Sequence, residues 1–157
     1  MQRGLVGWLL VVVQAVLIVA LVLLPPGSLW PTPAWVSGTG WAVSVLGGVW
    51  AVWAAVHLGD RLTPTPVPRG GGELRTDGPY AHSRHPIYTG VLLIVVGIAL
   101  RNGGAPALVV AAVTIGFFHA KAAFEERLLA ERFPNYPAYA SVTPRFVPRP
   151  WRTSRQD

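Results

Sequence analysis

The sequence contains no cysteine among its 157 residues, and only 13% of the residues are charged. The absence of cysteine excludes disulfide bonds, thiol nucleophiles and thiolate metal sites. The scarcity of charge is equally informative, because an ordinary soluble domain carries about 25% charged residues. Hydrophobic residues make up 52% of the chain and fall in long blocks. This composition is typical of a membrane protein.

The clearest block runs from Leu5 to Leu24, where Gln14 is the only strongly polar side chain. At about 1.5 Å per residue, such a helix crosses the roughly 30 Å hydrocarbon layer of a bilayer. A signal peptide is the alternative, since Arg3 precedes the run. However, the run is longer than the usual ~7 to 15 residue core, and no cleavage site of small residues follows it. We therefore expect a retained transmembrane helix.

Three further helices are expected at residues 41–58, 86–100 and 106–124, each bounded by proline, glycine or charge. The chain is thus predicted to be an all-α, polytopic membrane protein with a single membrane domain, 1–157. Four passes place both termini on the same side, together with the loop 59–85 and the segment 125–157. No histidine pair has the spacing of a helical metal site, and we expect no metal.

The distribution of charge gives the expected orientation. Of the thirteen Lys and Arg residues, all but Arg101 lie on the side of the termini, and the loop 25–40 has no ionisable residue. The positive-inside rule makes the charged side cytoplasmic, and we expect the plasma (inner) membrane. The same rule and attraction to membrane lipid head groups explain the net charge of +6, so nothing points to nucleic acid.

A polar stretch, Gly78 to Gly90, directly precedes and begins the third expected helix. Its imidazoles, guanidinium and phenols would be costly beside hydrocarbon unless they bound something or faced water. Residues 86–100 also span only about 22 Å, which is short for a bilayer. Either this helix tilts little and thins the bilayer, or its start lies below the interface. The second option would draw the turn at His85 and Pro86 into the membrane boundary, where a site could be reached by a lipid-like substrate and by a water-soluble cofactor.

A second cluster of polar residues lies at the end of the fourth expected helix, where Glu125 and Glu126 follow His119. Glu126 shares a helical face with His119, whereas Glu125 points about 100° away. Carboxylates are mildly unfavourable at a helix C-terminus, so another reason for them is expected. The alternative is that both acids are solvated or pair with nearby arginines.

These motifs resemble the signature of the isoprenylcysteine carboxyl methyltransferase and phospholipid methyltransferase group of membrane enzymes. The resemblance is carried by Glu-Leu-Arg-Thr-Asp-Gly-Pro-Tyr at 73–80 and by Arg-His-Pro-Ile-Tyr-Thr-Gly at 84–90. It continues with Glu-Glu-Arg-Leu-Leu at 125–129 and with Phe133, Tyr136, Tyr139 and Pro144-Arg145. The last part departs from the pattern, because Pro134 replaces a glycine and both tyrosines come one residue early.

The resemblance implies an S-adenosylmethionine-dependent methyltransferase whose cofactor site is formed by the last helix hairpin and its cytosolic flanks. The acceptor would be a lipid or another amphiphilic small molecule. Arg145 is a candidate catalytic residue for orienting an anionic acceptor, and His119 for lining the pocket or accepting a proton. Each has a structural alternative: Arg145 only contacts lipid phosphates, or His119 is only a hydrogen-bonded residue of its helix. The implied cofactor-binding residues are Tyr80, Arg84, His85, Pro86, Tyr88, Glu125 and Glu126.

Two other functions fit parts of the pattern. Sterol reductases that use NADPH share a related membrane architecture and a similar Arg-His motif, although Pro86 argues against them. A non-catalytic membrane binding protein of the same fold is the second alternative. His82 lies in a variable spacer of the motif and is expected at the surface.

Overall fold

The computed structural model describes residues 2–59 and 73–148, and all regular structure in these ranges is helical. Its helices are α1 (Gln2–Leu23), α2 (Ala34–Leu58), α3 (Pro79–His82), α4 (Pro86–Asn102), α5 (Ala105–Arg132) and α6 (Tyr136–Val142). Three stretches are long and apolar enough to cross a membrane, Gly4–Leu23, Ala34–Leu58 and Ala105–Arg132, and α4 is a shorter apolar helix. The predicted all-α, polytopic membrane fold is confirmed.

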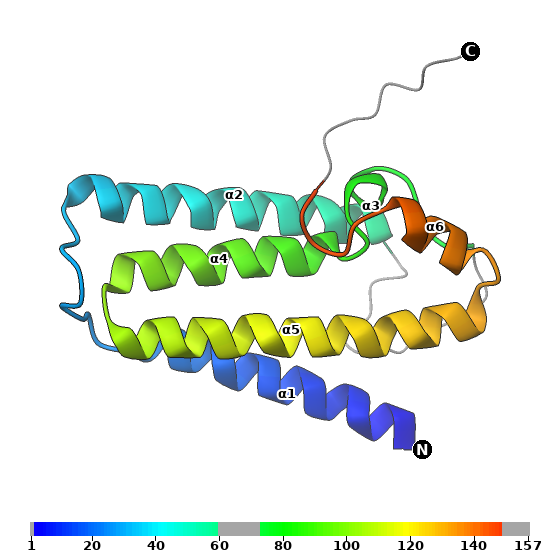
Figure 1. Ribbon diagram of the computed structural model, residues 1–157, viewed down its shortest axis with the longest axis horizontal. Helices are drawn as coiled ribbons and strands as arrows, with labels where there is room; N and C mark the ends of the chain where they lie inside the picture. Colours follow the sequence, from blue (N-terminus) through cyan, green and yellow to red (C-terminus); the bar gives the residue numbers. More distant parts are fainter. Residues whose placement is uncertain (1, 60–72, 149–157) are drawn as a thin grey trace, which may run out of the picture.

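Figure 1 shows the four long helices side by side, in the order α2, α4, α5 and α1. The α1–α2 loop and the α4–α5 turn lie at one end of this bundle. The short helices α3 and α6 lie at the other end, where α4 begins and α5 ends. We call these the loop end and the motif end. A core of buried apolar residues lies between the helices α1, α4 and α5. It consists of Leu21, Val95, Ala99, Ala107 and Ala111.

The helix bounds differ from those expected. The second helix begins at Ala34, directly after Pro33, and not at Trp41. The fourth long helix continues through both glutamates to Arg132, beyond the expected end at residue 124. Of the expected loop 59–85, residues 60–72 lie outside the described residues, as do 149–157 of the expected C-terminal segment.

Two glycines of α2 lie against α4, and one of them, Gly40, falls in the first turns of α2 that were not expected to be helical. A side chain on Gly40 would come within 2.7 Å of the carbonyl oxygen of Gly97, and one on Gly47 within 2.5 Å of that of Gly90. These glycines therefore let α2 and α4 approach closely, as small residues do between membrane helices. Gly40, which suggests a loop when only the sequence is considered, is therefore a point of contact between two helices.

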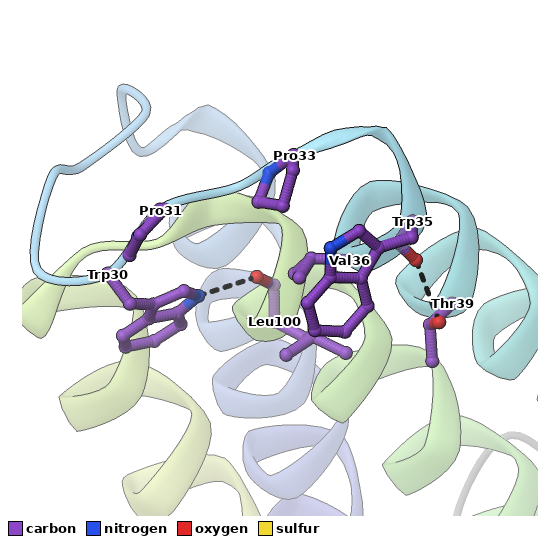
Figure 2. Close-up of a pocket in the computed structure, with 7 residues that line it drawn as sticks. All are labelled: Trp30, Pro31, Pro33, Trp35, Val36, Thr39 and Leu100. Atoms are coloured by element: carbon purple, nitrogen blue, oxygen red, sulfur yellow. Dashed lines mark hydrogen bonds between the residues drawn. The ribbon is translucent and has the colours of Figure 1, made fainter.

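The loop end is closed mainly by hydrogen bonds that involve the backbone. Gly27 N donates to Asn102 O and Leu29 N to Gly103 O, both at 2.7 Å, and Trp30 Nε1 donates to Leu100 O at 3.2 Å. Gly103 has a φ of 71°, which favours glycine at this turn. Beside it lies an apolar groove of about 430 Å³ (Figure 2), which is lined by Trp30, Pro31, Pro33, Trp35, Val36, Thr39 and Leu100.

Candidate functional site

The site at the motif end begins with a segment that docks on the start of α4. Arg84 N donates to Pro144 O at 2.9 Å, and His85 N donates to Arg145 O at 3.1 Å. The buried hydroxyl of Thr89 donates to Phe146 O at 2.7 Å. These bonds fix residues 144–146 beside the motif that precedes α4, and with them the backbone of Arg145.

Ser83 strengthens the same junction. Its hydroxyl is fully buried and donates to Arg145 O at 2.9 Å, while its oxygen also accepts the N–H of His85 at 3.3 Å. Ser83, Thr89 and Phe146 were not among the predicted site residues. Thr89 lies inside the recognised motif and Phe146 follows Arg145, so only their position in the sequence pointed to them.

His85 is held at the N-cap of α4, where Pro86 occupies the first helical turn. Proline is tolerated there because its missing N–H would have no intrahelical partner. The His85 side chain is 4% exposed, its ring stacks on Tyr88 at 5.2 Å between centroids, and its Nε2 lies 3.1 Å from Glu126 Oε1. Its Nδ1 lies 3.7 Å from Glu125 Oε2, so the imidazole faces both carboxylates.

Glu126 is the centre of a charged cluster. Arg145 donates to it through Nε at 2.9 Å and through Nη2 at 2.6 Å, and Arg84 Nη2 lies 3.5 Å from its Oε1. The bidentate pair is the strong geometry for guanidinium and carboxylate. This hydrogen bonding to Glu126 raises the pKa of Arg145 above its ordinary value. Pairing with arginine, the alternative considered from the sequence, thus applies to Glu126.

Glu125 has a different partner, although it is the next residue in the chain. The hydroxyl of Tyr88 donates to Glu125 Oε2 at 2.7 Å. Tyr88 also packs its ring edge-on to Phe118, at 5.1 Å between centroids. The two carboxylates are therefore separated in role: one is bound by two arginines and the imidazole, and the other mainly by a phenol.

The tyrosines of the flanking short helices lie against this cluster. Tyr139 of α6 donates to Tyr80 O at 2.6 Å, and burial raises the pKa of both phenols. Burial and the nearby Glu126 raise the pKa of Tyr136 to about 12. The buried hydroxyl of Tyr136 and the buried Nε of Arg84 have no hydrogen-bond partner among the described residues.

Two histidines lie further from the cluster. His119 is exposed on α5 and meets the ring of Phe146 edge-on at 4.7 Å, so one aromatic ring separates it from His85. His82, expected at the surface, is half-buried with its ring 6.4 Å from that of Trp50. In the described ranges, no three His, Asp or Glu side chains are grouped so as to hold a metal ion.

The fold and the site together define a helical membrane protein with an ionisable cluster at one end of its bundle. The family model described as phospholipid methyltransferase matches residues 35–136. The chain therefore belongs to this family of methyltransferases, which confirms the resemblance predicted from the motifs.

Two curated relatives extend the comparison. A nickel-cobalt-cadmium resistance protein, NccN, of Alcaligenes xylosoxydans xylosoxydans is 31% identical over 95% of this chain and 67% of its own length. A cobalt-zinc-cadmium resistance protein, CzcN, of Cupriavidus metallidurans is 34% identical over 66% of this chain and 45% of its own. The chain thus spans about two thirds of the first relative and under half of the second. No solved structure matches it.

Proposed function

We propose that the protein is an integral membrane methyltransferase that uses S-adenosylmethionine and methylates a lipid-like or other amphiphilic acceptor. Family membership supports the reaction class. The observation that carries the proposal further is the cluster itself, in which α4, α5 and the segment 144–146 bring an imidazole, two carboxylates and two guanidinium groups together. Such a set suits a small zwitterionic ligand.

The polar groups of the cluster fit the proposed cofactor. Glu125 and Glu126 can accept hydrogen bonds from its amine or its ribose hydroxyls, and Arg84 or His85 can bind its carboxylate. Tyr80 or Tyr88 can face its purine or its sulfonium. The unpartnered Arg84 Nε and Tyr136 hydroxyl are consistent with this role, because buried polar atoms normally have a partner.

S-adenosylmethionine, when bound, supplies an activated methyl group, so covalent help from the protein is not required. The residues of this chain would bind, orient and exclude water. His85 is 4% exposed and Glu126 12% exposed, which keeps their electrostatic interactions strong. Because Pro86 starts α4 at this point, the groups on the helix and before it are held rigidly.

The two candidate catalytic residues suit the acceptor side of the site. Arg145 binds Glu126 through Nε and Nη2, and these bonds leave Nη1 to meet an anionic acceptor or head group. His119 is exposed beside Phe146, where it can line the route to the cluster or accept a proton. The proposed orientation places the motif end and both termini on the cytoplasmic face of the plasma (inner) membrane.

The test is calorimetric binding to the protein purified in detergent. The wild-type protein should bind S-adenosylmethionine and S-adenosylhomocysteine, and Glu126→Gln should weaken binding about 100-fold, because it removes the carboxylate that pairs with two partly buried guanidinium groups. His85→Ala should also weaken it. Glu131→Gln, at an exposed carboxylate of the same helix, is the matched control.

Two results would contradict this proposal. Absence of binding of either nucleoside, together with binding of NADPH, would favour the reductase. Equal affinity in the wild-type protein, Glu126→Gln and His85→Ala would remove the cluster from the cofactor site. Transfer of a labelled methyl group to extracted lipid, followed by mass spectrometry of the product, would identify the acceptor.

A further inference from the structure

A buried lysine adjoins the cluster from the membrane side. Lys121 lies on α5, one helical turn before Glu125, and is 3% exposed. Its Nζ donates to Gln14 Oε1 at 2.5 Å. Gln14 is the one strongly polar side chain in the apolar run of α1, and its partner on α5 is this buried lysine.

The ammonium group also reaches the site. Nζ lies 5.0 Å from the centroid of the Tyr88 ring and 5.7 Å from that of Phe118. Both distances are within the range of a cation–π interaction, which strengthens where water is excluded. The same Tyr88 holds Glu125 through its hydroxyl. The contacts thus run from Gln14 through Lys121 and Tyr88 to Glu125.

A purely structural link between α1 and α5 does not require a charge. Two neutral polar side chains could make the same interhelical hydrogen bond without burying an ammonium group, which is expensive inside a membrane helix. The charge is held against the ring that carries the Glu125 contact. Its position is therefore better explained by an effect on Tyr88 and Glu125 than by helix association alone.

We propose that Lys121 is a positioning residue that fixes the Tyr88–Glu125 pair, and that Gln14 holds Lys121 in place. The inference rests on the proposed function, because the pair is assigned there to the cofactor. It brings α1 into the site, although α1 lies outside the region matched by the family model, 35–136. The N-terminal helix then supports ligand binding as well as membrane anchoring.

The decisive experiment exchanges the two residues. The double variant Gln14→Lys with Lys121→Gln keeps a hydrogen bond between α1 and α5 but moves the cation to α1. Thermal unfolding in detergent and calorimetric binding of S-adenosylhomocysteine are measured for this variant, for Lys121→Met and for Lys121→Arg. Lys121→Met should lower the unfolding temperature and weaken binding about tenfold.

The exchanged protein should have the unfolding temperature of wild type but the weaker affinity of Lys121→Met. Lys121→Arg should come close to wild type in both quantities. If the exchanged protein binds as tightly as wild type, Lys121 is only a structural link and the inference is wrong. The inference is also wrong if Lys121→Met binds S-adenosylhomocysteine as tightly as wild type. Failure of the wild-type protein to bind would overturn the proposed function instead, and this inference with it.

A second measurement does not depend on the cofactor. The protein is labelled with 3-fluorotyrosine, and the signal of Tyr88 is assigned by its loss in Tyr88→Phe. Removal of the cation in Lys121→Met should shift this fluorine resonance, and Lys121→Arg should shift it less. An unmoved resonance would show that the ammonium does not act on the ring.

Discussion

Both ends of the bundle use backbone hydrogen bonds, but the motif end adds a cluster of ionisable side chains. At the loop end, backbone groups bind one another, as in the bonds from Gly27 to Asn102 and from Leu29 to Gly103. At the motif end, ionisable side chains bind one another, with Glu126 between His85 and Arg145. Buried backbone groups must be paired in any fold, whereas buried charges are costly and dispensable for stability.

The comparison therefore separates a part of the molecule that serves the architecture from a part that serves the chemistry. Changes at the loop end should alter stability and leave cofactor affinity intact. Changes at the motif end should alter affinity, in some cases with stability. The following predictions test this separation, from the largest expected effect to the smallest.

The largest loss of stability is expected from Gly27→Ala. A β-carbon there would overlap the backbone of Gly104, which cannot move as a flexible side chain would. Overpacking of this kind costs about 3 kcal/mol. The unfolding temperature in detergent should fall, while the affinity for S-adenosylhomocysteine stays within about twofold.

Gly48→Ala is the matched control, because nothing lies within 4 Å of the added β-carbon in α2. It should stabilise the helix by about 1 kcal/mol. A large loss of cofactor affinity in Gly27→Ala would mean that the two ends are coupled and that the separation fails.

Thr89→Val should affect both stability and affinity. The change keeps the shape of the side chain but removes the hydroxyl that donates to Phe146 O. An unsatisfied buried carbonyl costs about 1–3 kcal/mol, and the segment that carries Arg145 would loosen. Calorimetry should show weaker binding of S-adenosylhomocysteine together with a lower unfolding temperature. Thr39→Val, at an exposed hydroxyl of the loop end, should leave binding unchanged.

Trp30→Phe should have a smaller effect, restricted to the loop end. It removes the hydrogen bond from the indole to Leu100 O, worth about 1 kcal/mol, and keeps an aromatic ring in the groove. The unfolding temperature should fall slightly with no change in binding. A change in cofactor affinity as large as that of Thr89→Val would contradict the comparison.

The smallest effect concerns acid stability. His57 Nε2 lies 3.2 Å from Asp77 Oδ2, and this contact lowers the pKa of Asp77 below its ordinary value of 3.8. Because the folded protein binds this proton less readily than the unfolded chain, the contribution is present above pH 3.8 and is lost as the pH falls through the lower folded pKa. Unfolding temperatures of wild type and Asp77→Asn should differ near neutral pH and converge in acid. A constant difference would exclude this linkage.

The sequence predicted that the four long helices exist because each is an apolar run, and three of them are long enough to cross a membrane. It placed the start of α2 too late, since Gly40 resembles a loop residue until the contact with α4 is known. It also stopped α5 before Glu125 because charge was expected to end the helix. In both cases tertiary contact, which a local pattern does not contain, decided the boundary.

The motifs selected the residues of the cluster but not their pairing. The separation of roles between Glu125 and Glu126 depends on where Tyr88 and Arg145 lie around the end of α5. The contact of Lys121 with Gln14 joins residues 107 apart and depends on the rotation of α1. The early spacing of Tyr139 does not prevent its hydroxyl from reaching Tyr80 O.

The docking of residues 144–146 on the start of α4 has a consequence for the order of assembly. Ser83 meets the carbonyl of Arg145 across 62 positions of the chain, and α4 and α5 lie between them. During synthesis the apolar helices are made before this segment, so a bundle can insert while the cluster still lacks Arg145. The protein is therefore expected to become competent for ligand only after residues 144–146 have been made and have docked on α4, when all four long helices have already been synthesised.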